Sequence, residues 1–101
     1  MLTSKQRAHL RSLANGIDTI LQIGKEGVTE NVLRQADDAL TARELIKGRV
    51  LETAPVLPRE AAAAVAEATG SEVVQVIGTL FGLFRRNLQS PKISLQKEDI
   101  H

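Results

Sequence analysis

A strand pattern that passes through two closely spaced glycines into a capped helix is the feature that most restricts the fold of this chain. Residues 17–23 alternate between apolar and polar positions, as a half-buried strand does. Glycine stands at positions 24 and 27, and Thr29 is a suitable N-cap for a helix that runs to about residue 43. The segment therefore predicts a strand, a tight turn and a helix in direct succession, which is typical of α/β arrangements.

The rest of the chain also alternates between helical and strand patterns. Thr3 and Gln6 form a predicted capping box, and Gly16 is expected to end that first helix in a left-handed conformation. Pro58 suits the first turn of a later helix, and Gly70 suits its end. The other expected elements are helices over residues 4–14 and 58–69 and strands over residues 44–53, 73–77 and 80–85, with a hairpin turn between the last two strands. The predicted order is α-β-α-β-α-β-β, an α/β (α+β) fold with one sheet and helices packed against it.

Length and composition favour one small domain without disulfides or metals. A chain of 101 residues has room for a single domain, which we place at residues 1–86, followed by a polar, extended tail over residues 87–101. The absence of cysteine excludes disulfides, thiolate metal sites and cysteine nucleophiles. No apolar run is long enough to span a membrane, and the first residues do not resemble a secretory signal. We therefore expect a cytoplasmic protein.

Residues 24–27, called the 24–27 loop below, suggest a phosphate-binding turn. Gly24 and Gly27 allow a phosphate to approach the backbone without interference from a Cβ atom. The following helix directs unpaired amides and its positive dipole end toward the loop, and Lys25 adds a cation. KH domains hold the nucleic-acid backbone with a Gly-X-X-Gly loop in this way. The spacing is also typical of ordinary strand-to-helix turns, and it matches neither the Walker A pattern nor the dinucleotide-binding fingerprint.

The charges of the chain nearly balance, so a nucleic-acid surface would need its cations on one face. Thirteen Lys and Arg oppose twelve Asp and Glu, which gives a formal net charge of +1. Lys47 and Arg49 share one side of the second strand, and Arg7 and Arg11 share one side of the first helix. The candidate phosphate or base contacts are Lys5, Arg7, His9, Arg11, Lys25, Lys47, Arg49, Arg85 and Arg86. A solvated surface is the ordinary explanation for any one of them.

No catalytic arrangement is recognisable in the sequence. The two histidines, His9 and His101, lie in a helix and at the C-terminus, with no positioned carboxylate or cysteine beside them. Asp37 and Asp38 are adjacent in a helix, where side chains diverge by about 100° and cannot chelate one ion well. We expect a protein that is not an enzyme and that uses no metal, cofactor or small-molecule substrate.

The sequence around the 24–27 loop resembles that of a known family. Residues 21–33 read LQIGKEGVTENVL, which resembles the signature of the CRM domain (chloroplast RNA splicing and ribosome maturation), in particular its bacterial stand-alone, YhbY-type members. The agreement extends to residues 44–47, 75–78 and 92–95. The resemblance implies a fold like the C-terminal domain of translation initiation factor three, with a mixed four-stranded sheet. It also implies binding to RNA in precursors of the large (50S) ribosomal subunit.

The resemblance also assigns roles to individual residues. In such proteins the Gly-X-X-Gly loop and neighbouring basic residues are thought to meet RNA. The residues carried over are Gly24, Lys25 and Gly27, with Lys5, Lys47 and Arg85 as supporting candidates. Glu26 departs from this logic, because its carboxylate would oppose a phosphate unless it turns outward.

Two functions are compatible with the sequence. The first is non-catalytic binding of 23S-type rRNA in 50S precursors by a monomeric assembly factor. Such a protein would recognise RNA shape, because Phe81 and Phe84 are the only aromatic residues and offer no stacking platform. The second is docking onto a ribosomal protein or assembly factor through an exposed sheet edge or a helical face. The first predicts binding that weakens with salt, and the second predicts salt-tolerant binding that survives loss of Lys25.

Overall fold

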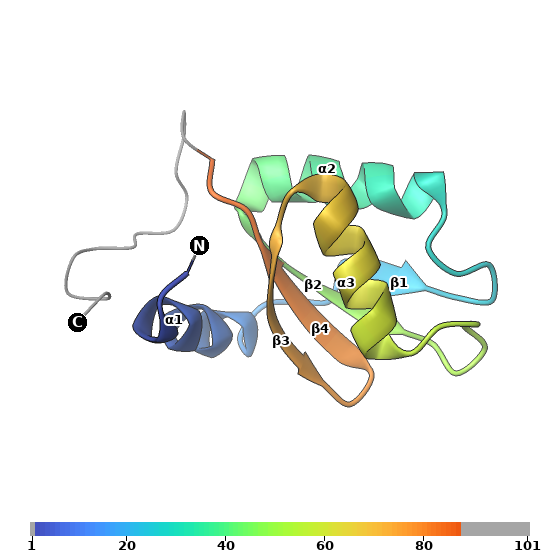
Figure 1. Ribbon diagram of the computed structural model, residues 1–101, viewed down its shortest axis with the longest axis horizontal. Coiled ribbons are helices and arrows are strands. Elements are labelled where there is room, and N and C mark those ends of the chain that lie inside the picture. Colours follow the sequence, from blue (N-terminus) through green and yellow to red (C-terminus); the bar gives the residue numbers. More distant parts are fainter. Residues whose placement is uncertain (1, 88–101) are drawn as a thin grey trace.

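Three helices and one four-stranded sheet make up residues 2–87, the part of the chain that the computed structural model describes (Figure 1). In chain order the elements are α1 (Ser4–Ala14), β1 (Leu21–Ile23), α2 (Glu30–Arg43), β2 (Leu45–Val50), α3 (Pro58–Thr69), β3 (Glu72–Ile77) and β4 (Leu80–Phe84). This order and the mixed sheet confirm the predicted fold class.

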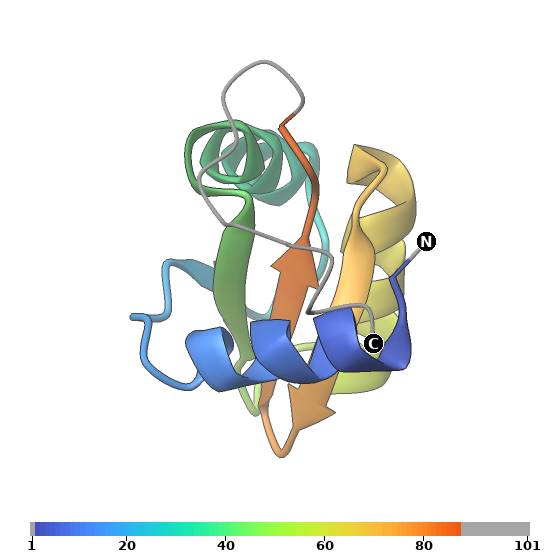
Figure 2. The same cartoon turned by 90° about the vertical axis from the view of Figure 1, so that its left-hand side faces the viewer.

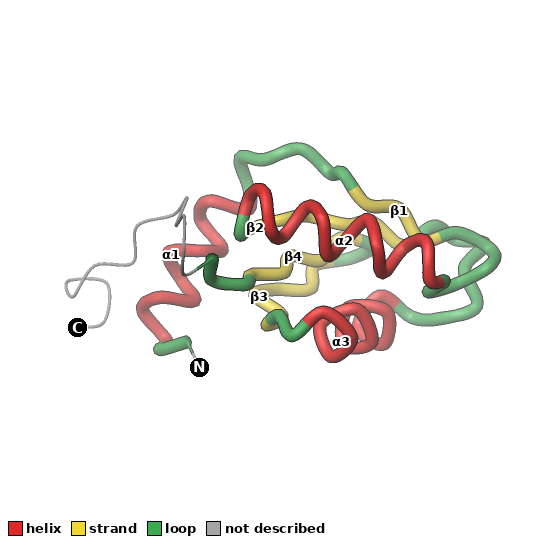
Figure 3. Tube along the Cα trace, turned by 90° about the horizontal axis from the view of Figure 1, so that it is seen from above, coloured by secondary structure: helices red, strands yellow, loops and turns green. Residues whose placement is uncertain are grey.

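The sheet has the strand order β1-β2-β4-β3. β1 runs parallel to β2, whereas β4 is antiparallel to both β2 and β3. Parallel neighbours need a crossover, which α2 supplies, so the loops that follow β1 and β2 leave the sheet at the same end. Figures 1 and 3 show both loops at that end and α1 toward the other end. The 24–27 loop and α1 are therefore separated along the molecule.

The helices cover the two faces of the sheet unequally. α2 and α3 lie side by side on one face (Figure 3), where Leu40, Ile46 and Val65 belong to the larger buried core. α1 runs across the strands on the other face (Figure 2), and Leu10 packs there with Leu45 and Phe84 in a smaller core. A single helix on this second face leaves part of the sheet without a helical cover.

Two glycines are needed where the layers meet. The Phe81 ring on β4 lies over Gly48 on β2, and a Cβ atom at Gly48 would come within 2.3 Å of the ring's Cζ atom. On the opposite face, a Cβ atom at Gly82 would lie 3.7 Å from the Cβ atom of Ala14, so α1 packs closely against β4. Core packing explains Gly48, which the sequence places between two cationic residues.

The predicted helices agree with the structure better than the first strand does. The helices over residues 4–14 and 58–69 are confirmed, and so is the capping box, in which the Gln6 amide donates to Thr3 Oγ1 at 3.1 Å. The strand predicted over residues 17–23 is wrong in extent, since β1 covers only Leu21–Ile23 and Ile17 packs against the smaller core. Burial beneath α1 outweighs the alternating pattern at the start of this segment.

The predicted role of Gly16 is wrong. Asn15 ends α1 with right-handed backbone angles, and its N–H donates to the Arg11 carbonyl at 3.2 Å. Gly16 does not have a positive φ. The helix therefore ends in a tightened right-handed turn, without the left-handed residue that the glycine suggested.

The second strand is also shorter than predicted, because β2 ends at Val50 rather than at residue 53. A turn follows at once, in which the Ala54 amide donates to the Leu51 carbonyl at 3.0 Å. Asn87, the first residue of the predicted tail, is held to the domain through its N–H, which donates to Glu44 Oε2 at 2.6 Å. The rest of that tail, residues 88–101, lies outside the described residues, so the domain boundary stays a prediction.

Candidate nucleic-acid interface

The 24–27 loop is a closed turn with two charged residues at its tip. The Gly27 amide donates to the Gly24 carbonyl at 2.9 Å, which places Lys25 and Glu26 at the exposed corners. The Gly27 N–H is therefore used inside the loop and is not available to an anion. Among residues 2–87, no group accepts a hydrogen bond from the Lys25 or Glu26 amide. The backbone donors that can meet a phosphate are thus at the tip of the turn.

The two glycines of the loop have different reasons to be glycine. Gly27 has φ = +73°, and a Cβ atom there would lie 3.3 Å from Pro55 Cγ in the loop after β2. Both facts come from the fold, so Gly27 is required with or without a ligand. Gly24 has no positive φ, and a Cβ atom there would only make ordinary contact with Leu51 Cδ1 at 3.7 Å. The fold itself therefore does not require glycine at position 24. A ligand that approaches the backbone closely at this position would require glycine there.

The start of α2 adds a partial positive charge beside the loop. Thr29 is the N-cap, as predicted, and its Oγ1 accepts from the Val32 amide at 3.2 Å. The amides of Glu30 and Asn31 begin the helix and lie outside its internal hydrogen-bond pattern. They are donors of the kind that bind anions at helix starts, although the Glu30 side chain in the first turn offsets part of that charge.

The two side chains at the loop tip differ in sign. Lys25 is exposed and forms no ion pair with any residue of the described part of the chain. Glu26 is exposed as well, so its carboxylate can remain in water beside an anion held by Lys25. The opposition that Glu26 was expected to create is therefore limited to screened surface repulsion.

Lys47 and Arg49 lie on the same side of β2, as predicted. Their neighbours Ile46 and Gly48 are buried on the side of α2 and α3, so Lys47 and Arg49 face the side of α1. Arg49 is exposed and Lys47 is half-buried. The two cations share a face of the sheet, but Lys25 extends from the loop beyond its end.

The cations of α1 divide into free and engaged side chains. Lys5 and Arg11 are exposed, and His9 is half-buried. Arg7, in contrast, donates to the Val73 carbonyl and lies 3.9 Å from Glu72 Oε2. Arg7 therefore fastens α1 to β3, and only the other basic residues of this helix are available to a ligand.

Arg85 is held by the domain on several sides. Its Nη1 atom donates to Asp37 Oδ1 at 2.6 Å and to the Thr69 carbonyl at 2.8 Å. Its Nη2 atom donates to the Asp37 carbonyl at 3.0 Å and to Thr41 Oγ1 at 2.7 Å. The guanidinium joins the end of β4 to α2 and to the end of α3, which is a structural role. An RNA contact by Arg85 stays a prediction, and it would require some of these bonds to break.

Glu44 is a buried carboxylate that the sequence did not reveal as special. It is 0% exposed and has φ = +65°, which no other non-glycine residue among residues 2–87 shares. Its Oε2 atom accepts from the Asn87 amide and lies 3.8 Å from Arg86 Nη1. Arg86, another predicted RNA contact, is therefore paired within the chain. The passage from α2 to β2 without a glycine was the one signal that a non-glycine residue must adopt this conformation.

Apart from the engaged side chains of Arg7, Arg85 and Arg86, the predicted RNA contacts lie in three places. Lys25 lies at the loop end, Lys47 and Arg49 lie on the sheet, and Lys5, His9 and Arg11 lie on α1 toward the other end. Exposed cations that were not predicted are Arg34 and Arg43 on α2 and Arg59 on α3. No single basic patch gathers all the predicted residues, so any one ligand that meets most of them must extend along the domain.

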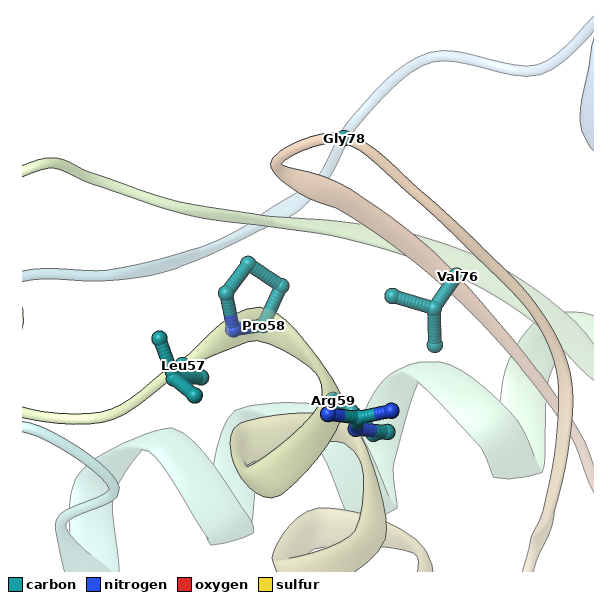
Figure 4. A pocket seen from close by; sticks show the side chains of 5 residues that line it. All are labelled: Leu57, Pro58, Arg59, Val76 and Gly78. Atoms are coloured by element: carbon teal, nitrogen blue, oxygen red, sulfur yellow. The ribbon is translucent and has the colours of Figure 1, made fainter.

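A shallow pocket lies between the start of α3 and the β3–β4 hairpin (Figure 4). Its volume is about 350 Å³, and its lining residues are Leu57, Pro58, Arg59, Val76 and Gly78. Leu57 is 59% exposed beside it. The lining combines aliphatic side chains with the Arg59 guanidinium, and none of the lining residues is suited to acid–base catalysis.

Within residues 2–87, no three His, Cys, Asp or Glu side chains lie close enough to hold a metal ion. None of the helices found there is both long enough and apolar enough to cross a membrane.

Comparisons with known proteins agree with the resemblance found in the sequence. The family model of the CRS1/YhbY (CRM) domain matches residues 2–85. The chain is 39% identical over 95 residues to Probable RNA-binding protein YqeI of Bacillus subtilis, which covers 94% of this chain and 99% of that protein. It is 31% identical to an RNA-binding protein of Haemophilus influenzae, with 96% and 97% covered. The solution structure of the hypothetical protein SAV1595 from Staphylococcus aureus is similar with a TM-score of 0.80 and 48% identity, covering 95% of this chain and all of that one.

Proposed function

We propose that this chain, which belongs to the CRS1/YhbY (CRM) domain family, is a non-catalytic protein that binds rRNA in precursors of the large ribosomal subunit. Its site of action is the cytoplasm, its ligand is 23S-type rRNA or a pre-50S particle, and it acts as a monomer. Support comes from the relatives in Bacillus subtilis and Haemophilus influenzae, whose names describe RNA-binding proteins.

The observation that carries the proposal is the geometry of the 24–27 loop. Lys25 stands unpaired at the tip of a closed turn, beside the start of α2, and the fold gives no reason for glycine at position 24. A phosphate at this tip would meet the Lys25 ammonium and the free tip amides together. The loop therefore acts as a clamp on the RNA backbone, which reads position and shape rather than base identity.

The supporting cations are fewer than the sequence suggested. Arg7, Arg85 and Arg86 are engaged within the domain, so they contribute at most a background positive potential. The revised interface consists of the 24–27 loop with Lys47 and Arg49, and RNA long enough to reach α1 also meets Lys5 and Arg11. Each released counterion makes such binding steeper in salt.

Docking onto a protein is the second candidate function. The observation in its favour is the pocket beside the exposed side chains of Leu57 and Val76, with the Arg59 guanidinium at its edge. An apolar side chain would suit Leu57 and Val76, and that part of the contact would depend little on salt, whereas a carboxylate at Arg59 would add a salt-sensitive ion pair. The relatives whose names describe RNA-binding proteins support RNA binding, and no comparison supports protein docking, so RNA binding is the better supported function.

The test is binding of the purified protein to large-subunit rRNA across a salt series. We expect the logarithm of the affinity to fall steeply with the logarithm of salt, and Lys25→Ala to reduce that slope by about one. Arg34→Ala, which removes an exposed cation from α2, is the matched control and should leave the slope nearly unchanged. If binding does not depend on salt and both variants bind equally well, protein docking becomes the better supported function.

A further inference from the structure

The face of the sheet that α1 only partly covers carries a continuous row of side chains. α1 covers one end of this face, where Leu45, Val74 and Phe84 are buried beneath it. Beyond that end, strand pairing places four residues side by side across all four strands. In register, Gln22 pairs with Arg49, Arg49 pairs with Leu80, and Leu80 pairs with Ile77. We call Gln22, Arg49, Leu80 and Ile77 the open row.

The open row is accessible to a ligand. Gln22 and Arg49 are exposed, Ile77 is 59% exposed and Leu80 is half-buried. Their chain neighbours, among them Ile23, Val50 and Phe81, are buried on the opposite face, so alternation directs the open row away from the core. A lone exposed isoleucine is ordinary, but here two aliphatic side chains continue a guanidinium and an amide in one line.

The charges on these strands favour an anionic partner. Lys47 precedes Arg49 by two residues in β2, so it lies on the same face of the sheet next to the open row, and it is half-buried. The described strands contain one carboxylate, Glu72, which lies at the α1 end of the sheet. Glu72 accepts from the Leu2 amide at 3.3 Å and pairs with Arg7. The open row therefore contains one cation, Arg49, and has a second, Lys47, beside it, whereas no carboxylate of the described strands lies within it.

The open row adjoins the 24–27 loop. Gln22 precedes Gly24 by two residues, and the Leu51 amide donates to the Ile23 carbonyl at 2.9 Å. At the same end of the sheet, the Val50 amide donates to the Thr79 carbonyl in the hairpin turn at 2.8 Å. These hydrogen bonds join the start of the 24–27 loop, the end of β2 and the hairpin turn at one end of the sheet. A strand of RNA that leaves the loop can continue over the open row without crossing a helix.

We propose that the open row binds unpaired nucleotides that adjoin the RNA held by the 24–27 loop. The Arg49 guanidinium stacks on a base, and the Gln22 amide donates to and accepts from base edges. Leu80 and Ile77 make apolar contact with the next base, and Lys47 meets the phosphate between them. This proposal rests on the proposed RNA binding and adds its substrate class: a helix with an adjoining single-stranded segment, in which bases as well as shape are read.

The test compares two RNAs with two matched variant pairs. One RNA is a blunt hairpin, and the other is the same hairpin with an unpaired extension. The first pair is Arg49→Gln against Arg34→Gln, which removes an exposed cation from the open row or from α2. The second pair is Ile77→Ser against Val76→Ser, which changes exposed side chains on opposite faces of β3. Thermal unfolding of all four variants confirms that each is folded before binding is measured.

We expect the full chain to bind the extended RNA about tenfold more tightly than the blunt hairpin, as one or two base contacts would give. Arg49→Gln and Ile77→Ser should remove most of that preference, whereas their controls keep it. Photo-crosslinking from 4-thiouridine in the extension should label β2, β3 or β4 at the open row.

Two outcomes would overturn the proposal. Equal affinity for both RNAs with a retained salt slope leaves the 24–27 loop as the RNA clamp and removes the open row from the interface. A preference that survives Arg49→Gln and Ile77→Ser, with crosslinks elsewhere, assigns the unpaired nucleotides to another surface. Failure of the proposed function is distinct, since the protein would then bind neither RNA in a salt-dependent way.

Discussion

Lys25 at the loop end and Arg85 at the end of β4 are both cations that the family resemblance connects with RNA, yet their surroundings are opposite. Lys25 is exposed and unpaired among the described residues, and nothing in the domain depends on its ammonium. Arg85 is bound to Asp37, Thr41 and Thr69, and with Glu44 and Asn87 it closes the far end of the sheet. The difference separates a cation that is available to a ligand from one that holds the fold. Stability and RNA binding should therefore respond to different residues at the two ends.

Glu44→Ala should have the largest effect on stability. The variant leaves the Asn87 amide and the Arg86 guanidinium without their buried acceptor, and we expect the free energy of unfolding to fall by about 3 kcal/mol in urea denaturation. Glu44→Gly is the matched variant, because it removes the same carboxylate but relieves the positive φ. If Glu44→Ala and the native chain unfold at the same urea concentration, the contacts of the Glu44 carboxylate do not stabilise the fold.

Arg85→Ala should come next, with a loss of about 2 kcal/mol in the free energy of unfolding. Most of that loss comes from hydrogen bonds to carbonyls and Thr41, since Asp37 is 56% exposed and a surface ion pair contributes little. Arg85→Lys should recover only a part, because an ammonium cannot reach all four acceptors. RNA affinity of the folded variant, measured at a temperature well below its unfolding, should change no more than for loss of one distant charge. A large loss of affinity in Arg85→Lys without a loss of stability would return this residue to the interface.

The two loop glycines should separate stability from binding within one turn. Gly27→Ala should lower the free energy of unfolding by about 1–2 kcal/mol, because its φ is positive and Pro55 is close. Gly24→Ala should change stability by less than about 0.5 kcal/mol, because the added Cβ makes only ordinary contact with Leu51 and φ is not positive. Gly24→Ala should nevertheless weaken binding to rRNA, since its methyl group occupies the approach to the backbone. Equal RNA affinity in Gly24→Ala and the native chain would argue against a close backbone contact at this position.

Lys25→Ala should have the smallest effect on the fold. We expect thermal unfolding to be unchanged within about 0.5 kcal/mol, because the side chain forms no ion pair within the described residues. The same variant reduces the salt slope of RNA binding in the experiment proposed above. A clear loss of stability would show that the two ends of the sheet differ less than their contacts indicate.

The sequence predicted the element order and the bounds of all three helices, because caps and prolines are local signals. Thr3 with Gln6, Thr29 and Pro58 each act on the backbone within one turn of themselves. Strand ends were predicted less well. Whether Ile17 pairs in the sheet or packs beneath α1 depends on tertiary packing, and periodicity carries no information about that.

The sequence predicted which residues surround the candidate site, but not which of their side chains are free to bind a ligand. The 24–27 loop lies where the pattern placed it, and Lys47 and Arg49 share a face as expected. That Arg7, Arg85 and Arg86 are engaged follows from partners 66, 48 and 42 positions away in the chain, which no local pattern relates to them. Glu44 was missed for the same reason, since its carboxylate acts on residues that follow β4. Whether the remaining cations meet RNA stays a prediction.

The position of β4 has a consequence for how the protein is made. β4 is the last strand of residues 2–87, but it lies between β2 and β3 and pairs with both. While the chain emerges from the ribosome, β2 and β3 have no common neighbour until residues 80–84 are outside, so both present unpaired edges. β1 and β2 can pair earlier, but the four-stranded sheet and the open row are complete only when β4 joins β2 and β3. A nascent chain that stalls before β4 would therefore have exposed strand edges prone to aggregation and an incomplete open row, so the proposed binding of nucleotides there requires β4 to have emerged.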